Sequence, residues 1–186
     1  MGTNHHYGYQ IRKIYTTAWL MRKAILKSSR RDDILKTLLF WSALQETRRP
    51  CAEIRDEMLD SWNTLLQPKL IAAMMIPDEC ERVQALQGLS RWVSGSVNCT
   101  PGTIGGIKVD GTTFHHGGFY PAYTTGALAT VGDYVAMTSG TEFVPSLEAR
   151  RLLASAFTAM RNYSNLIEWS TGLGGRHPFG GKMGGA

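Results

Sequence analysis

Apolar residues recur at the spacing of an α-helix along most of this 186-residue chain, and this periodicity limits the fold more than any other feature. Between Tyr7 and Lys27 they stand three or four positions apart, which places them on one face of a helix. Similar runs follow residues 28–33, cross 52–67, resume at 70–76 and extend over 83–93. Convincing strands are absent from the pattern. The sequence therefore predicts an all-α fold of antiparallel helical hairpins.

Prolines mark the expected boundaries of these helices. Pro50 separates two runs, and Pro68 breaks or bends the run around it. Pro77, Pro121 and Pro145 each suit the first residue of a helix, where the missing N–H costs nothing.

Two long glycine-rich segments interrupt the helices, one from Gly95 to Tyr120 and one from Thr171 onward. Neither has a helical or strand period, so both are predicted to be loops, and long loops of this kind are often functional. Stacked helical hairpins place their long loops on one face. We therefore expect a site where these two loops meet the N-terminal residues 4–9.

The loops carry an unusual set of side chains. His115 and His116 lie in the first glycine-rich turn, Tyr123 follows at the start of a helix, and Arg176 and His177 lie in the second. Imidazole, phenol and guanidinium together suit removal of a weakly acidic proton from a carbon beside a carboxylate. Such chemistry indicates an enzyme acting on an acidic sugar polymer.

Tyr123 needs help to act as a base, because a free phenol titrates at about 10. With Pro121 as the first helical residue, Tyr123 falls in the first turn, near the positive end of the helix dipole. A nearby Arg176 would also favour the phenolate. Both effects predict a lowered pKa for Tyr123.

The composition limits the classes of partner that the chain is expected to bind. The net charge of +5 favours anionic ligands, but the basic residues form no dense block, so nucleic acid is not predicted. No apolar run is long enough to cross a bilayer, so no membrane partner is expected. The three cysteines show no CxxC spacing, and each is expected to be a small buried residue.

Each candidate also has an ordinary structural interpretation. His116 could be a loop histidine bonded to backbone, Tyr123 a half-buried helix tyrosine and Arg176 a surface cation. The histidine pairs could suggest metal ligands, with Asp110 or Asp133 joining them. Adjacent histidines point in different directions, however, so no cofactor is predicted; a divalent cation is allowed by the sequence but not supported by it.

Three motifs resemble polysaccharide lyase family 8, and most closely its chondroitin sulfate ABC lyase branch. They are TNHHYGYQIRKIY at the start, DGTTFHHGGFYPAY in the middle and GLGGRHPFGG near the end, and the likeness covers nearly all of the chain. The resemblance implies an incomplete α/α toroid followed by β-sheet domains. It also implies cleavage of glycosaminoglycans by β-elimination at uronic acid, and a secreted or periplasmic location for the parent protein.

Matched to the family motif, His116 and Tyr123 fall on the catalytic histidine and tyrosine, and Arg176 falls on the catalytic arginine that stabilises the substrate carboxylate. His5 and His6 fall on a histidine pair that lines the cleft, and Asn4 lies near a family asparagine. If His5 or His6 serves the opposite sugar face, one cleft could process both uronate epimers.

The remaining predicted contacts come from residues beside these motifs. His115, Tyr120 and His177 are expected to bind substrate, and several aromatic side chains near the loops could stack on sugar rings: Trp92, Phe119, Tyr120, Trp169 and Phe179.

One family feature is missing from the sequence. The family uses a glutamate from further along and β-sheet domains beyond it, and the chain stops before both. We therefore expect residues 1–186 to be a single fragment of an α/α-toroid catalytic domain, for which the absent C-terminal β-sheet domains are partners. The alternative function is a helical module that binds acidic polysaccharide without cleaving it; a helical nucleic-acid-binding protein is supported by charge alone.

Overall fold

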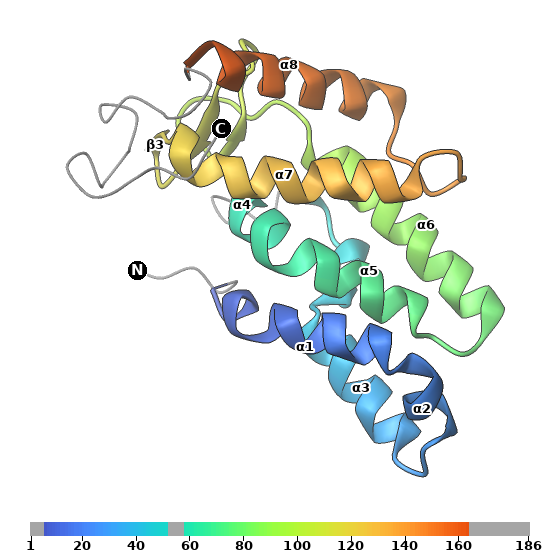
Figure 1. The fold of residues 1–186 in the computed structure, drawn as a ribbon. Helices are drawn as coiled ribbons and strands as arrows, with labels where there is room; N and C mark the ends of the chain where they lie inside the picture. The colour runs from blue at the N-terminus through green and yellow to red at the C-terminus, as the bar shows by residue number, and fades with distance from the viewer. Residues whose placement is uncertain (1–5, 52–57, 164–186) are drawn as a thin grey trace.

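The computed structural model describes residues 6–51 and 58–163, and these are mostly helical (Figure 1), as the sequence predicts. The α-helices are α1 (Gly8–Leu20), α2 (Arg22–Lys27), α3 (Arg31–Trp41), α4 (Met58–Asp60), α5 (Leu66–Met74), α6 (Glu79–Ser96), α7 (Pro121–Thr138) and α8 (Leu147–Tyr163). A 3-10 helix, η1, covers Leu44–Arg48, and a π-helical turn, η3, covers Ser61–Leu65.

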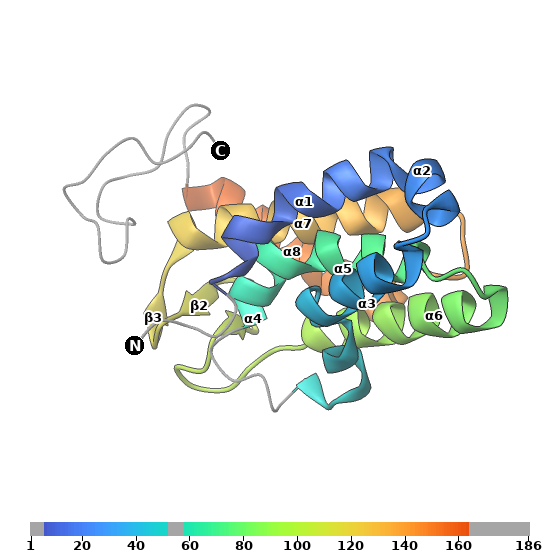
Figure 2. The same cartoon turned by 90° about the horizontal axis from the view of Figure 1, so that it is seen from below.

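Helix α5 lies at the centre of the arrangement and packs against α1, α3, α6 and α7. Helices α7 and α8 run side by side in opposite directions, as Figure 1 shows, and α8 also contacts α6. Figure 2, a view from below, places α6 on the opposite side of α5 from α1. The antiparallel hairpins are thus confirmed, whereas the toroid stays a prediction.

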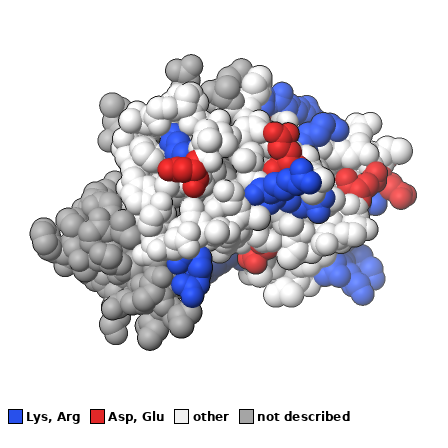
Figure 3. Space-filling view, turned by 90° about the horizontal axis from the view of Figure 1, so that it is seen from above, with Lys and Arg blue, Asp and Glu red and all other residues white. Residues whose placement is uncertain are grey.

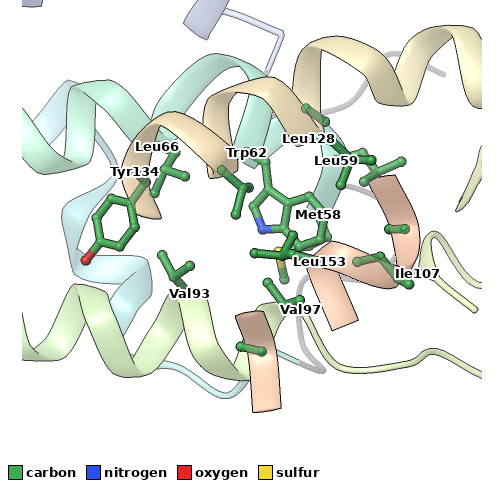
Figure 4. Packing of buried hydrophobic residues seen from close by; sticks show 14 of the residues in the cluster. Met58, Leu59, Trp62, Leu66, Val93, Val97, Ile107, Leu128, Tyr134 and Leu153 are labelled. Carbon is green, nitrogen blue, oxygen red and sulfur yellow. The ribbon is translucent and has the colours of Figure 1, made fainter. Parts of the chain in front are cut away.

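Two apolar clusters hold these helices together. The larger surrounds Trp62, whose ring is fully buried among side chains of α4, α6, α7 and α8 (Figure 4). Its indole Nε1 donates a hydrogen bond to Ser96 Oγ at 2.9 Å. The smaller cluster joins α1, α3 and α5 around Tyr15. Helix α5 contributes Leu66 and Leu70 to the first cluster and Ile71 to the second, so it links the two.

A buried lysine ties α5 to η1. The Lys69 side chain is fully buried, and its Nζ lies 3.1 Å from Glu46 Oε2 and 3.2 Å from Ser61 Oγ. Burial lowers the pKa of the Lys69 ammonium, and Glu46 opposes that shift. Breaking such a pair by removing one partner is strongly destabilising, because the other charge is left buried.

The helix boundaries correct several predictions. Pro121 begins α7 as expected, but α6 and α8 begin two residues after their prolines. There Asp78 Oδ1 accepts a hydrogen bond from the Glu81 N–H at 2.8 Å, and Ser146 Oγ accepts one from the Ala149 N–H at 3.2 Å. Side chains that cap free N–H groups set these two ends.

Two further boundaries differ. The expected helix from Tyr7 to Lys27 divides at Met21, and α2, which buries no residue fully, packs against α3 through Ile25. Pro68 does not end its run: it is the third residue of α5, which continues directly from the π-helical turn.

A small antiparallel sheet, in the order β1-β2-β3, occupies part of the glycine-rich segment that was predicted to be a loop. Its strands are β1 (Gly106–Ile107), β2 (Thr113–His115) and β3 (Gly118–Phe119). Strands of two or three residues are too short to display a period, so the sequence pattern missed them.

The prediction of buried cysteines is wrong for two of the three. Cys80 and Cys99 are exposed, and Cys51 is half-buried with its Sγ donating to the Trp92 carbonyl. Cys80 lies in the polar first turn of α6, which faces solvent.

Gly8 allows α1 to approach the π-helical turn closely. A Cβ at this position would lie 2.3 Å from Thr64 Oγ1. We expect Gly8→Ala to lower the free energy of unfolding by ~1–3 kcal/mol, the usual cost of overpacking. Gly88→Ala, in the open interior of α6, is the matched control and should stabilise by ~0.5–1 kcal/mol. Equal effects of the two changes in denaturant titrations would contradict the close contact.

Two buried tyrosines predict a loss of stability at alkaline pH. Burial raises the pKa of Tyr15 and of Tyr134 above the ordinary value, so the folded state keeps protons that the unfolded chain releases. Their contribution is complete below pH ~10 and falls by about 1.4 kcal/mol per pH unit for each tyrosine as pH rises further. Denaturant unfolding at several alkaline pH values should show a shallower decline for Tyr134→Phe. An unchanged slope would count against this assignment.

Candidate active site

The two histidines of the β2–β3 hairpin differ in burial, although their ring centroids lie only 3.8 Å apart. His116 and Gly117 form its two-residue turn, with φ values of 53° and 76°. Positive φ at both positions is what a type I′ turn requires, and histidine adopts it more readily than most residues. His116 is exposed on this turn, whereas His115, the last residue of β2, points inward with 1% of its surface exposed.

The hairpin is fixed to the start of α7. Thr113 Oγ1 donates to Thr124 Oγ1 at 2.8 Å, and the Tyr120 N–H donates to the Thr113 carbonyl at 3.1 Å. These bonds hold the ring of His115 in a stack with that of Tyr123, with centroids 4.4 Å apart and planes 21° apart. The His116 ring centroid lies 6.3 Å from that of Tyr123. The ring of His116 thus lies near that of Tyr123, and the catalytic role predicted for the two residues stays a prediction.

A buried carboxylate, Asp60 at the end of α4, lies beneath these rings. It has no exposed surface, and its Oδ1 accepts a hydrogen bond from the Tyr123 hydroxyl. His6 Nε2 lies 3.6 Å from Asp60 Oδ1, and His115 Nε2 lies 3.7 Å from Asp60 Oδ2. Sequence reasoning missed Asp60. Its signal was an acid placed inside the apolar stretch MLDSWNTLL.

Two more side chains complete the hydrogen bonding of Tyr123. Tyr9 Oη lies 2.9 Å from Tyr123 Oη, and Asn63 Nδ2 donates to Tyr9 Oη at 2.9 Å. These residues come from α1 and the π-helical turn. Neither was predicted for the site, and the sequence gives no local signal that would have singled them out.

The π-helical turn brings Asp60 and Asn63 to the same place. It adds one residue to a turn directly after Asp60, and Thr64 Oγ1 donates to the Asp60 carbonyl at 2.8 Å. Turns of this kind are uncommon and occur frequently at functional sites.

The pKa of Tyr123 moves in the direction opposite to the one predicted. Burial raises it well above the ordinary value, and the hydrogen bonds to Asp60 and Tyr9, with the negative charge of Asp60, raise it further. Tyr123 does lie in the first turn of α7, as predicted. Burial and the adjacent carboxylate outweigh the helix dipole, which is worth ~0.3–1 kcal/mol at an exposed helix end.

The other predicted residues fall into two groups. His6 is partly exposed and reaches the site, whereas His115 and Tyr120 are buried, so neither offers the open face that the predicted substrate contact needs. The following predicted residues lie outside the described residues: Asn4, His5, Trp169, Arg176, His177 and Phe179.

The two remaining aromatic predictions fare differently. Trp92 belongs to the buried core and is not a sugar-stacking residue. Phe119 is half-buried and packs edge-on against the ring of Tyr163, with centroids 5.2 Å apart.

The part of the chain with described coordinates contains no group of three or more potential metal ligands. Asp110, suggested as a ligand, instead accepts hydrogen bonds from the N–H and hydroxyl of Thr112. None of the helices in that part is long and apolar enough to cross a membrane.

One groove of the described residues lies away from these side chains. It has a volume of about 1010 Å³ and runs between α3, η1, α5 and α6. A smaller cavity of about 120 Å³ lies beside Asn63, between α1, α5 and α7. The candidate site is therefore recognised by its chemistry and not by its volume.

Charges are scattered over the surface. On the face in Figure 3, lysine and arginine side chains lie in separate groups, with acidic residues among them. This face presents no continuous basic track of the kind that nucleic-acid binding requires.

The chain is similar to known proteins along almost its whole length. Residues 1–185 match the protein family described as "Lyase, catalytic". A chondroitin sulfate ABC exolyase from Bacteroides thetaiotaomicron is 33% identical over 183 residues, which are 98% of this chain and 18% of that protein. An exolyase of the same name from Proteus vulgaris is 31% identical over 94% of this chain and 18% of its own length.

A third relative is the chondroitin sulfate ABC endolyase of Proteus vulgaris, 28% identical over 95% of this chain and 17% of its own length. The chain thus spans less than a fifth of the length of the relatives it matches. The match along almost the whole sequence, together with these relatives, shows that the chain belongs to the family of lyase catalytic domains.

Proposed function

We propose that this chain carries proton-transfer groups of a polysaccharide lyase that cleaves glycosaminoglycans of the chondroitin and dermatan sulfate class. The observation that carries the proposal is the Tyr123 hydroxyl, hydrogen-bonded to Asp60 beside the exposed His116 of the β2–β3 turn. The family match and the printed names of the relatives supply the reaction class.

The chemistry requires a base near the C5 proton of a uronic acid and a proton donor for the leaving O4. Tyr123 and His116 are the groups that we assign to these transfers. Removing the C5 proton places a second negative charge beside the carboxylate, so a cation must stabilise it. Arg176 is the residue that we propose for this role, since its fork of donors matches a carboxylate.

Tyr123→Phe tests the proposal most directly. Phenylalanine keeps the ring stacked on His115 but removes the hydroxyl that transfers the proton. We expect turnover of chondroitin sulfate, followed by the ultraviolet absorbance of the new C4=C5 double bond, to fall by at least ~10²-fold. Thr125→Ala, on the same helix, is the control and should retain activity. Salt-sensitive retention of the unaltered protein on a chondroitin column without any turnover would favour the binding module instead.

His6→Ala tests the role of the N-terminal histidines. If His6 serves the opposite face of the sugar, the change should reduce dermatan cleavage by ~10-fold or more beyond its effect on chondroitin cleavage, the lower end of what a positioned acid or base contributes. Initial rates on the two polymers provide the comparison. Equal losses on both would show that His6 does not distinguish the epimers.

A further inference from the structure

The hydrogen bonds around Tyr123 all run in one direction. A carboxylate can only accept, so the single hydroxyl proton of Tyr123 is committed to Asp60. Tyr9 must then be the donor in its 2.9 Å bond with Tyr123, and Asn63 in turn donates to Tyr9. The chain of donation therefore runs from Asn63 through Tyr9 and Tyr123 to the buried acid.

This direction decides what Tyr123 can do for a substrate. The Tyr123 hydroxyl donates a hydrogen bond to Asp60, and its oxygen accepts one from Tyr9. One lone pair of that oxygen is left. Through that lone pair Tyr123 can accept a proton from the substrate, and the only proton that it can give back to the substrate is the one received there. Because burial and Asp60 raise its pKa, a standing phenolate is disfavoured, so its own proton must leave as another arrives.

Asp60 is the neighbour that we consider as the receiver of the Tyr123 hydroxyl proton. His6 precedes α1 and His115 ends β2, and each places its Nε2 within 3.7 Å of an Asp60 oxygen. The rings of His116 and Tyr120 lie 6.3 Å and 5.5 Å from the Tyr123 ring, measured between centroids. Asp60 Oδ2 accepts no hydrogen bond from the described residues, so it has room for a proton.

We propose that Asp60 is a positioning residue that acts through Tyr123, taking the tyrosine proton while Tyr123 takes the C5 proton. The inference rests on the lyase function proposed above. The C5–H bond breaks and its electron pair forms the C4=C5 double bond as the C4–O4 bond breaks. Tyr123 then passes a proton to O4, and Asp60 returns its proton to Tyr123. The protein ends unchanged, and no other reactant is needed.

Asp60→Asn separates this role from simple orientation, because the amide oxygen accepts the Tyr123 hydrogen bond but does not take its proton. In the full-length protein we expect unchanged retention on chondroitin, little change in KM and a kcat lowered by ~10²-fold or more. Tyr9→Phe removes one hydrogen-bond donor to Tyr123 but keeps Asp60 as the acceptor of the Tyr123 proton. It is the matched control and should lower kcat by less than ~10-fold. An Asp60→Asn protein that retains kcat would overturn the inference.

A spectroscopic titration tests the contact between Asp60 and Tyr123 without measuring turnover. Removing the Asp60 charge should let Tyr123 ionise at lower pH, seen as tyrosinate absorbance present in Asp60→Asn and absent from Asp60→Asn/Tyr123→Phe. An unshifted titration would contradict the inference.

Two outcomes keep the proposals separable. An unaltered protein that releases no unsaturated product refutes the lyase function, whereas an active unaltered protein with an active Asp60→Asn variant refutes only the relay. If Asp60→Asn does not fold, the unaltered enzyme decides: the relay requires slower turnover in D₂O, and equal rates in H₂O and D₂O would refute it.

Discussion

The burial of Asp60 is the constraint on which the site depends. A carboxylate removed from water is costly unless hydrogen bonds and nearby charges compensate it. Its partners come from three separate segments: His6 before α1, His115 at the end of β2 and Tyr123 on α7. Helix α4 can therefore bury this acid only when the hairpin, α1 and α7 have all docked, which couples assembly of the site to assembly of the core.

The helices and the place of Tyr123 in the first turn of α7 were predictable because their signals are local. An apolar face repeats every three to four residues, and a proline at the first position of α7 fixes Tyr123 in the first turn. The short strands carried no such signal, since β1 and β3 have two residues each. They depend on pairing across the chain, which periodicity cannot register.

The polar network around Tyr123 could not be predicted from the sequence, for a related reason. Asp60 and Asn63 share the site because a π-helical turn follows Asp60, and an acid between apolar neighbours was the one available hint. The direction of the Tyr123 pKa shift was also missed, because it is set by burial and by a carboxylate 63 positions away. Tertiary contacts, not the local helix end, control the electrostatics of this phenol.

The β2–β3 hairpin limits how the length of this region can change during evolution. Side chains alternate between the faces of a strand, so inserting or deleting one residue in β2 would turn the His115 imidazole outward and put its neighbour against the tyrosine. A length change in the two-residue turn would instead move His116 relative to the Tyr123 ring. A change of length between Thr113 and Tyr123 would therefore disturb the arrangement of the imidazoles around the phenol, whereas a longer connection outside this interval would leave it intact.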